Sequence, residues 1–177
     1  KRQACCSTAF ICRGSRTVGW KELVGLRTML DHQERIQLIR NTVGIGTAFW
    51  FNRNPPFDST VPHTFIVIGA RNDGTYLCVH GTSKVNFHRD KILEEHFNNK
   101  NVNQTFVVVR QGYSALFGQD TLIDGNKVWA LKANDIAEGL KGFREVDAEV
   151  GLMQAIVAAV NKSKAHSTAI KKCVRAQ

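Results

Sequence analysis

The residue types best suited to chemistry in this sequence are two histidines, two hydroxyls and a lysine: His63, His80, Thr82, Ser83 and Lys84. An imidazole titrates near neutral pH and can exchange protons, whereas hydroxyl and ammonium groups can donate hydrogen bonds to a phosphate. Cleavage of RNA without a metal needs a group that takes the 2′-hydroxyl proton, donors for the phosphoryl oxygens and an acid for the leaving oxygen. The five residues together offer these functions.

A predicted β-hairpin brings the five residues together. Its strands are expected from the apolar runs at residues 63–69 and 75–80. The connection contains Asp73-Gly74, and Asp-Gly between apolar runs favours a tight turn because glycine adopts a positive φ without strain. In an antiparallel pair the start of one strand lies beside the end of the next. We therefore expect His63 and His80 to flank Thr82.

Each of these residues also has a structural interpretation, which the sequence leaves open. A Thr-Ser pair after a strand often forms a turn or caps a helix. His63 follows Pro62 and can bond a loop carbonyl, and Lys84 can be a solvated loop lysine. Arg110 ends another apolar strand, where it can contact a phosphate or form a surface salt bridge.

Metal or nucleotide-cofactor chemistry has little support in the sequence. His88 and His96 lie eight residues apart without a cysteine or paired carboxylate at zinc-site spacing. There is no GxxxxGKS/T or GxGxxG motif. None of the five cysteines forms a CxxC pair, and Cys78 is expected to be a buried thiol. We predict no metal, no cofactor and a reducing, cytoplasmic compartment.

The rest of the chain predicts short elements around the hairpin. Helices are expected at residues 30–41, 89–97, 133–140, 149–162 and 167–174, and further strands at 47–51, 105–109 and 121–131, the last broken at Asp124-Gly125-Asn126. The strands follow too closely for βαβ crossovers, so we expect an α+β fold with a small, mostly antiparallel, bent sheet or barrel and a C-terminal helix. No apolar run approaches the roughly 20 residues of a membrane span, so no membrane is expected.

Positive charge is concentrated at the two ends of the chain. Residues 1–28 contain six basic residues and one acidic residue, and residues 161–177 contain five basic residues and no acid, whereas the whole chain has a net charge of +9. Such ends favour an acidic partner such as nucleic acid, or they are solvated termini. We expect residues 1–28 to be a basic extension and residues 29–177 to be a single domain with a basic C-terminal tail.

Across residues 44–162 the order of motifs resembles the PemK/MazF-type toxin family, including its ToxN-like relatives. The motifs are the aromatic strand AFWF, a Pro-rich loop, HTFIVI, a strand ending in Thr82-Ser83, and IDGN before VWAL. The Thr82-Ser83 pair is the best match. Asp124 and Asn126 match an Asp-x-Asn element of the family. His63 stands where many members have an arginine, which is a departure from the family pattern.

The resemblance implies a toxin-like SH3-like barrel domain and a metal-independent endoribonuclease acting on single-stranded RNA. It also implies neutralisation by a protein or RNA antitoxin, and it is compatible with a homodimer. We predict catalysis by His63, His80, Thr82 and Ser83, and RNA binding by Lys84, Arg110 and Asn126. The alternative is a non-catalytic SH3-like barrel that binds a protein or a nucleic acid, because one fold hosts many functions.

Overall fold

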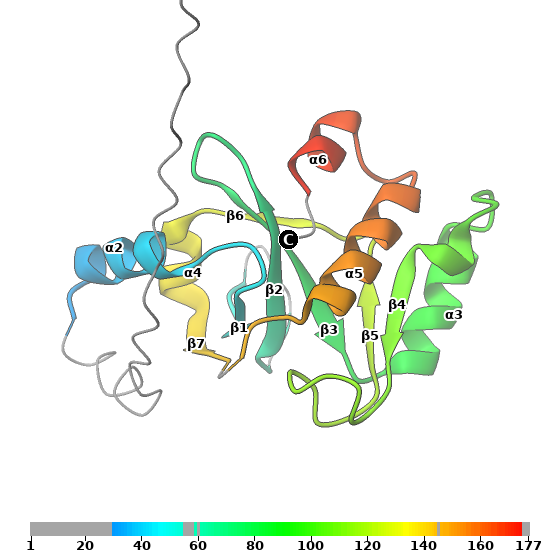
Figure 1. Cartoon of the computed structure of the whole chain (residues 1–177), viewed down its shortest axis with the longest axis horizontal. Coiled ribbons are helices and arrows are strands. Elements are labelled where there is room, and N and C mark those ends of the chain that lie inside the picture. The colour runs from blue at the N-terminus through cyan, green and yellow to red at the C-terminus, as the bar shows by residue number, and fades with distance from the viewer. Residues whose placement is uncertain (1–29, 55–58, 60, 145, 175–177) are drawn as a thin grey trace, which may run out of the picture.

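A seven-stranded antiparallel sheet forms the centre of the protein in the computed structural model, which describes residues 30–54, 59, 61–144 and 146–174 (Figure 1). The strands are β1 Ala48–Phe51, β2 His63–Ala70, β3 Tyr76–Thr82, β4 Phe106–Val109, β5 Thr121–Asp124, β6 Trp129–Leu131 and β7 Leu140–Phe143. Their order is β4-β5-β3-β2-β1-β7, and β6 pairs with β3. Within the described residues β4 and β7 do not pair with each other, so the sheet is open. The α+β, antiparallel prediction is confirmed, whereas a closed barrel is not shown.

The predicted hairpin is the pair β2–β3, which lies in the middle of the sheet. Phe65 pairs with His80, and the register shifts between Val67 and Gly69. Gly74 in the connecting turn has a φ of 79°, which explains the Asp-Gly sequence there. The hairpin prediction is therefore confirmed with nearly the expected strand bounds.

Each face of the sheet carries its own hydrophobic core, because side chains alternate along β2 and β3. Phe65, Val67 and Cys78 pack on one face with α2 (His32–Thr42) and α4 (Ala133–Gly139). On the other face, Ile66, Ile68, Leu77 and Val79 pack with α5 (Val150–Lys162). Cys78 is fully buried, as expected from the sequence, and this burial raises the pKa of its thiol.

The helices follow the sequence signals where those signals are strong. Asp31 and Glu34 form a capping box at the start of α2, which lies within one or two residues of the expected helix at residues 30–41. In contrast, α3 (Val85–Glu95) begins four residues before the expected start at residue 89. Its first residues lack a capping side chain that would mark the start in the sequence. A 3₁₀ turn, η1 (Val102–Gln104), follows this helix.

The basic C-terminal segment is part of the folded domain as far as residue 174. Helix α6 (Thr168–Cys173) follows α5, and Val174 forms an isolated antiparallel bridge with Gly69 of β2. Val174 is 5% exposed and belongs to the core on the α5 side. Residues 1–29, which include the predicted N-terminal extension, lie outside the described residues.

Strand β7 is absent from the sequence-based prediction. It has only four residues, of which Gly142 and Lys141 do not favour a strand. Pairing with β1 defines it, with Phe49 opposite Phe143. In the described part of the chain, no helix is both long and apolar enough to cross a membrane.

Candidate functional site

The first part of the site is His63, which begins β2 beside the end of β3. The register of β2 and β3 pairs Phe65 with His80, and its continuation by two residues places His63 opposite Thr82. The His63 Nδ1 atom lies 3.1 Å from the carbonyl oxygen of Gly81. Because a carbonyl oxygen can only accept, Nδ1 carries the hydrogen and the lone pair of the neutral ring lies on Nε2. Nε2 is therefore the atom at which neutral His63 takes up a proton.

His80 lies next to His63 and has the opposite tautomer. The Trp129 indole N–H donates to His80 Nδ1 over 3.0 Å, so neutral His80 carries its hydrogen on Nε2. Its ring stacks on Phe65, with centroids 5.5 Å apart, and meets the His63 ring edge-on at the same centroid distance. The predicted pair of histidines is thus brought together, with a proton acceptor on one ring and a donor on the other.

His80 is held neutral by its surroundings. Burial lowers its pKa to about 3, and the nearby positive charges of His63, Lys127 and His88 act in the same direction. At neutral pH the ring is therefore a hydrogen-bond donor through Nε2 and carries no charge. The hydrogen bonds thus leave the lone pair of neutral His63 on Nε2 and a hydrogen-bond donor on Nε2 of His80.

The lowered pKa of His80 makes stability depend on pH. Below about pH 6.5 the unfolded chain binds a proton at His80 that the folded chain does not bind until about pH 3, so stability falls as the pH falls. Between pH 8 and pH 5 we expect the free energy of unfolding to fall by about 2 kcal/mol because of His80. In His80→Gln, whose amide oxygen can still accept from Trp129, this part of the pH dependence should disappear. Urea denaturation of both proteins at the two pH values checks this, and an equal loss in both would contradict it.

The second part of the site is the start of α3, directly after β3. Thr82 is buried, and its hydroxyl accepts a hydrogen bond from the Lys84 backbone N–H at 3.4 Å. It therefore shapes the turn into the helix, in agreement with the structural interpretation of that residue. Ser83 is exposed. No described side chain caps α3 at Lys84, so the N–H groups of its first turn and its positive dipole end are available to an anion.

Three residues of the site are not among the site residues predicted from the sequence: His88, which was considered only as a metal ligand, Lys127 and Trp129. His88 lies one helical turn after Lys84 on α3, and burial lowers its pKa, followed by the charges of Lys127 and Lys91. The spacing of Lys84 and His88 would have placed them on one helix face if the true helix start had been recognised. We call His63, His80, His88, Lys84 and Lys127 the histidine–lysine cluster.

Arg110 lies at the same end of the sheet but belongs to an ion pair. Thr82 pairs with Leu122 of β5, which in turn pairs with Val108 of β4, so Arg110 stands two strands away from Thr82. Its guanidinium lies 2.7 Å from the Asp120 carboxylate, and its side chain is largely exposed. The surface salt bridge considered from the sequence is present, and RNA binding by Arg110 stays a prediction.

The side chain of Asn126 is turned into the protein and has internal partners. It donates to Thr105 Oγ1 at 2.8 Å and to Asp124 Oδ1 at 2.9 Å, and it accepts from Ser163 Oγ at 2.7 Å. These bonds connect the turn after β5 to the end of α5. The geometry gives Asn126 a structural role, and its predicted contact with RNA gains no support from this arrangement.

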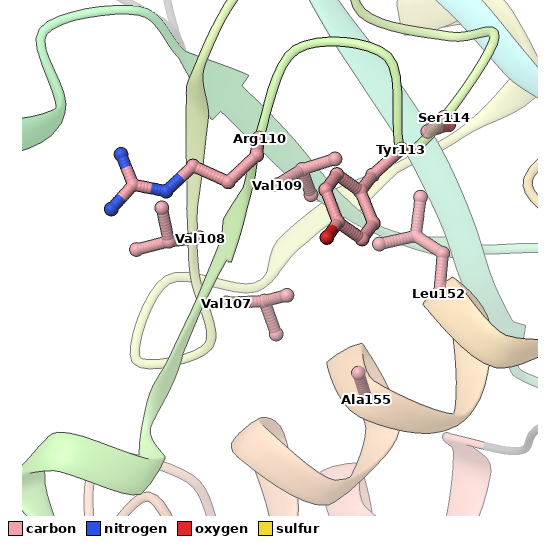
Figure 2. Close-up of a pocket in the computed structure, with 8 residues that line it drawn as sticks. All are labelled: Val107, Val108, Val109, Arg110, Tyr113, Ser114, Leu152 and Ala155. Atoms are coloured by element: carbon pink, nitrogen blue, oxygen red, sulfur yellow. The ribbon is translucent and has the colours of Figure 1, made fainter.

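A separate groove lies on the other side of the sheet, between β4 and α5 (Figure 2). Its volume is about 250 Å³, and its lining is Val107, Val108, Val109, Arg110, Tyr113, Ser114, Leu152 and Ala155. Figure 2 shows the Arg110 side chain pointing away from α5. The groove borders the core on the α5 side, whereas the two site histidines lie with Phe65 on the opposite face.

No model of a known protein family matches the chain, and no curated protein sequence matches it significantly. Among the described residues there is also no group of three His, Cys, Asp or Glu side chains placed to hold a metal ion. The geometry of the histidine–lysine cluster is therefore the basis for a function.

Proposed function

We propose that the protein is an endoribonuclease that cleaves single-stranded RNA without a metal ion. The observation that carries this proposal is the pair of adjacent imidazoles, His63 and His80, whose hydrogen bonds give them opposite tautomers. They stand beside a helix start with positive charge from Lys84 and Lys127. A proton acceptor next to donors and cations is what transesterification at a phosphodiester requires.

In the proposed reaction, His63 Nε2 takes the proton of the 2′-hydroxyl, and the 2′-oxygen attacks the adjacent phosphorus. The P–O5′ bond breaks, a 2′,3′-cyclic phosphate forms, and the leaving 5′-oxygen takes a proton from water. The ammonium groups of Lys84 and Lys127 and the first N–H groups of α3 stabilise the charge on the phosphoryl oxygens. His80 donates from Nε2 to a phosphoryl oxygen.

The resemblance to the PemK/MazF-type family supplies the rest of the proposal. The bent sheet around β1, β2 and β3 would correspond to the SH3-like barrel of that family. A protein or RNA antitoxin would be the partner and the cytoplasm the compartment, with a homodimer as one assembly. Ser83, which is exposed beside Lys84, would contact the substrate, while Thr82 would hold the turn that presents it.

Cleavage is expected to survive EDTA, because the proposed chemistry uses only groups of this chain and water. Purified protein is incubated with mixed single-stranded RNA in EDTA, and the new ends are mapped. Products should carry a 2′,3′-cyclic phosphate and a 5′-hydroxyl. A preparation of His63→Asn made in the same way controls for contaminating nucleases. Strict dependence on added Mg²⁺, or products with a 5′-phosphate, would overturn the mechanism.

A second candidate is a non-catalytic binding module, and the groove between β4 and α5 favours it. Strand β4 ends the sheet, and an end strand can accept an extended peptide by adding a strand. Tyr113 at the groove is 85% exposed and could provide an aromatic contact. Intact RNA in the EDTA assay, together with strand addition at β4 in a captured complex, would favour this function.

A further inference from the structure

An exposed aromatic ring lies beside the histidine–lysine cluster on α3. The side chain of Phe87 is 64% exposed although it belongs to the first turn of the helix. Its ring meets the His88 ring edge-on, with centroids 5.2 Å apart and an interplanar angle of 89°. In an edge-on pair, one ring presents its edge to a face of the other ring. The contact therefore does not cover both faces of either ring, and a further ring can stack on the pair.

Positive charges flank this ring along the helix. Lys84 is three residues before Phe87 and Lys91 is four residues after it, so the three side chains occupy one helix face. Both lysines are close enough to lower the pKa of the adjacent His88. An aromatic ring between cations is the combination with which proteins hold single-stranded nucleic acid: bases stack on the ring and phosphates pair with the cations.

We propose that Phe87 is the stacking platform for an unpaired nucleobase next to the cleaved phosphate, so that the substrate is bound as a single strand. The position of Phe87 next to the cleaved phosphate rests on the proposed function. The binding test below does not, because it uses RNA that cannot be cleaved. In a duplex both faces of each base are already stacked, so Phe87 can engage a base only after it is unpaired. The phosphates on either side of that base are placed against Lys84 and Lys91. The Lys91 ammonium lies 3.6 Å from the Glu95 carboxylate in an exposed ion pair, which a phosphate would displace.

The test is a binding measurement on the full chain with a substrate that cannot be cleaved. The probe is a fluorescently labelled, random-sequence decamer of 2′-O-methyl RNA, in which the attacking hydroxyl is blocked. Phe87→Ala should weaken its binding about five- to a hundredfold, as expected for the loss of one base–aromatic stack. Phe87→Trp should restore the affinity. Phe97→Ala is the matched control, since Phe97 is 74% exposed and lies just beyond the other end of α3.

The same probe annealed to its complement should bind more weakly and should be insensitive to Phe87→Ala. If Phe87→Ala binds the single strand as tightly as Phe97→Ala does, the stacking proposal is wrong even where wild-type protein cleaves RNA. If binding depends on Phe87 while natural RNA stays intact, the stacking proposal stands and the nuclease proposal fails. A wild-type chain that does not bind the probe at all overturns the stacking proposal, and cleavage in EDTA then tests the nuclease proposal separately.

Discussion

Replacing His63 by asparagine is expected to lower the rate of RNA cleavage by about two to four orders of magnitude. The amide nitrogen of asparagine lies near the place of Nδ1 and can keep the hydrogen bond to the Gly81 carbonyl. It has no counterpart of the basic Nε2 atom. The substitution therefore removes proton uptake while it preserves the local contact, and the melting temperature should change little. Single-turnover cleavage of a labelled single-stranded RNA measures the effect.

A matched control for this variant is His96→Asn. His96 follows α3 as its C-terminal cap residue and is a half-buried histidine outside the histidine–lysine cluster. Cleavage by this variant should stay within about twofold of wild type, as for most changes outside a catalytic site. Binding of the 2′-O-methyl RNA should persist in His63→Asn, because Lys84, Lys127 and Phe87 remain. Full cleavage activity in His63→Asn would remove His63 as the proton acceptor.

The sequence predicts the centre of this site because its geometry is local. An Asp-Gly turn between two apolar runs defines an antiparallel pair, and that pair brings His63 close to His80. The tautomers could not be predicted in the same way. They depend on Trp129, which reaches His80 from a strand about fifty residues further along the chain, and on the backbone of Gly81. Such long-range pairings leave no periodic signal in a single sequence.

The start of α3 shows a second limit of sequence reasoning. Lys84 at the helix start makes no side-chain cap, and Val85-Asn86-Phe87 has no particular helical preference. The helix therefore begins earlier than propensity indicates, and this earlier start places Lys84, Phe87 and His88 in one or two turns. Because no described side chain caps α3 at Lys84, the sequence carries no signal for the helix start. For the same reason, the first N–H groups of the helix can bind an anion.

The arrangement of the C-terminal segment had one signal in the sequence, a glycine inside the apolar run of β2. A glycine within a strand often marks the close approach of another backbone. In the structure, Gly69 faces the backbone of Cys173 and Val174. The glycine therefore predicts a close contact, but only the structure identifies the C-terminal segment as the partner.

Replacing Gly69 by alanine is expected to lower the free energy of unfolding by about 2–4 kcal/mol. An ideal Cβ at this position would lie 2.1 Å from the carbonyl oxygen of Cys173 and 2.9 Å from its carbonyl carbon. These are backbone atoms, so rotation of a side chain cannot relieve the overlap. The φ of Gly69 is not positive, and alanine itself would be unstrained there. The whole cost should therefore come from displacing the segment after α6, including the buried Val174.

Gly118→Ala is the matched control, because a Cβ at Gly118 meets no atom within 4 Å and its φ is also not positive. Its stability should equal that of the wild type or exceed it by a few tenths of a kcal/mol, since alanine restricts the unfolded chain. Urea denaturation gives the two free energies. Amide hydrogen exchange then shows which part of the fold is destabilised. Exchange in α6 should accelerate in Gly69→Ala, while α2 stays protected. If Gly69→Ala is as stable as Gly118→Ala and α6 stays protected, the C-terminal segment does not pack on β2 in this way.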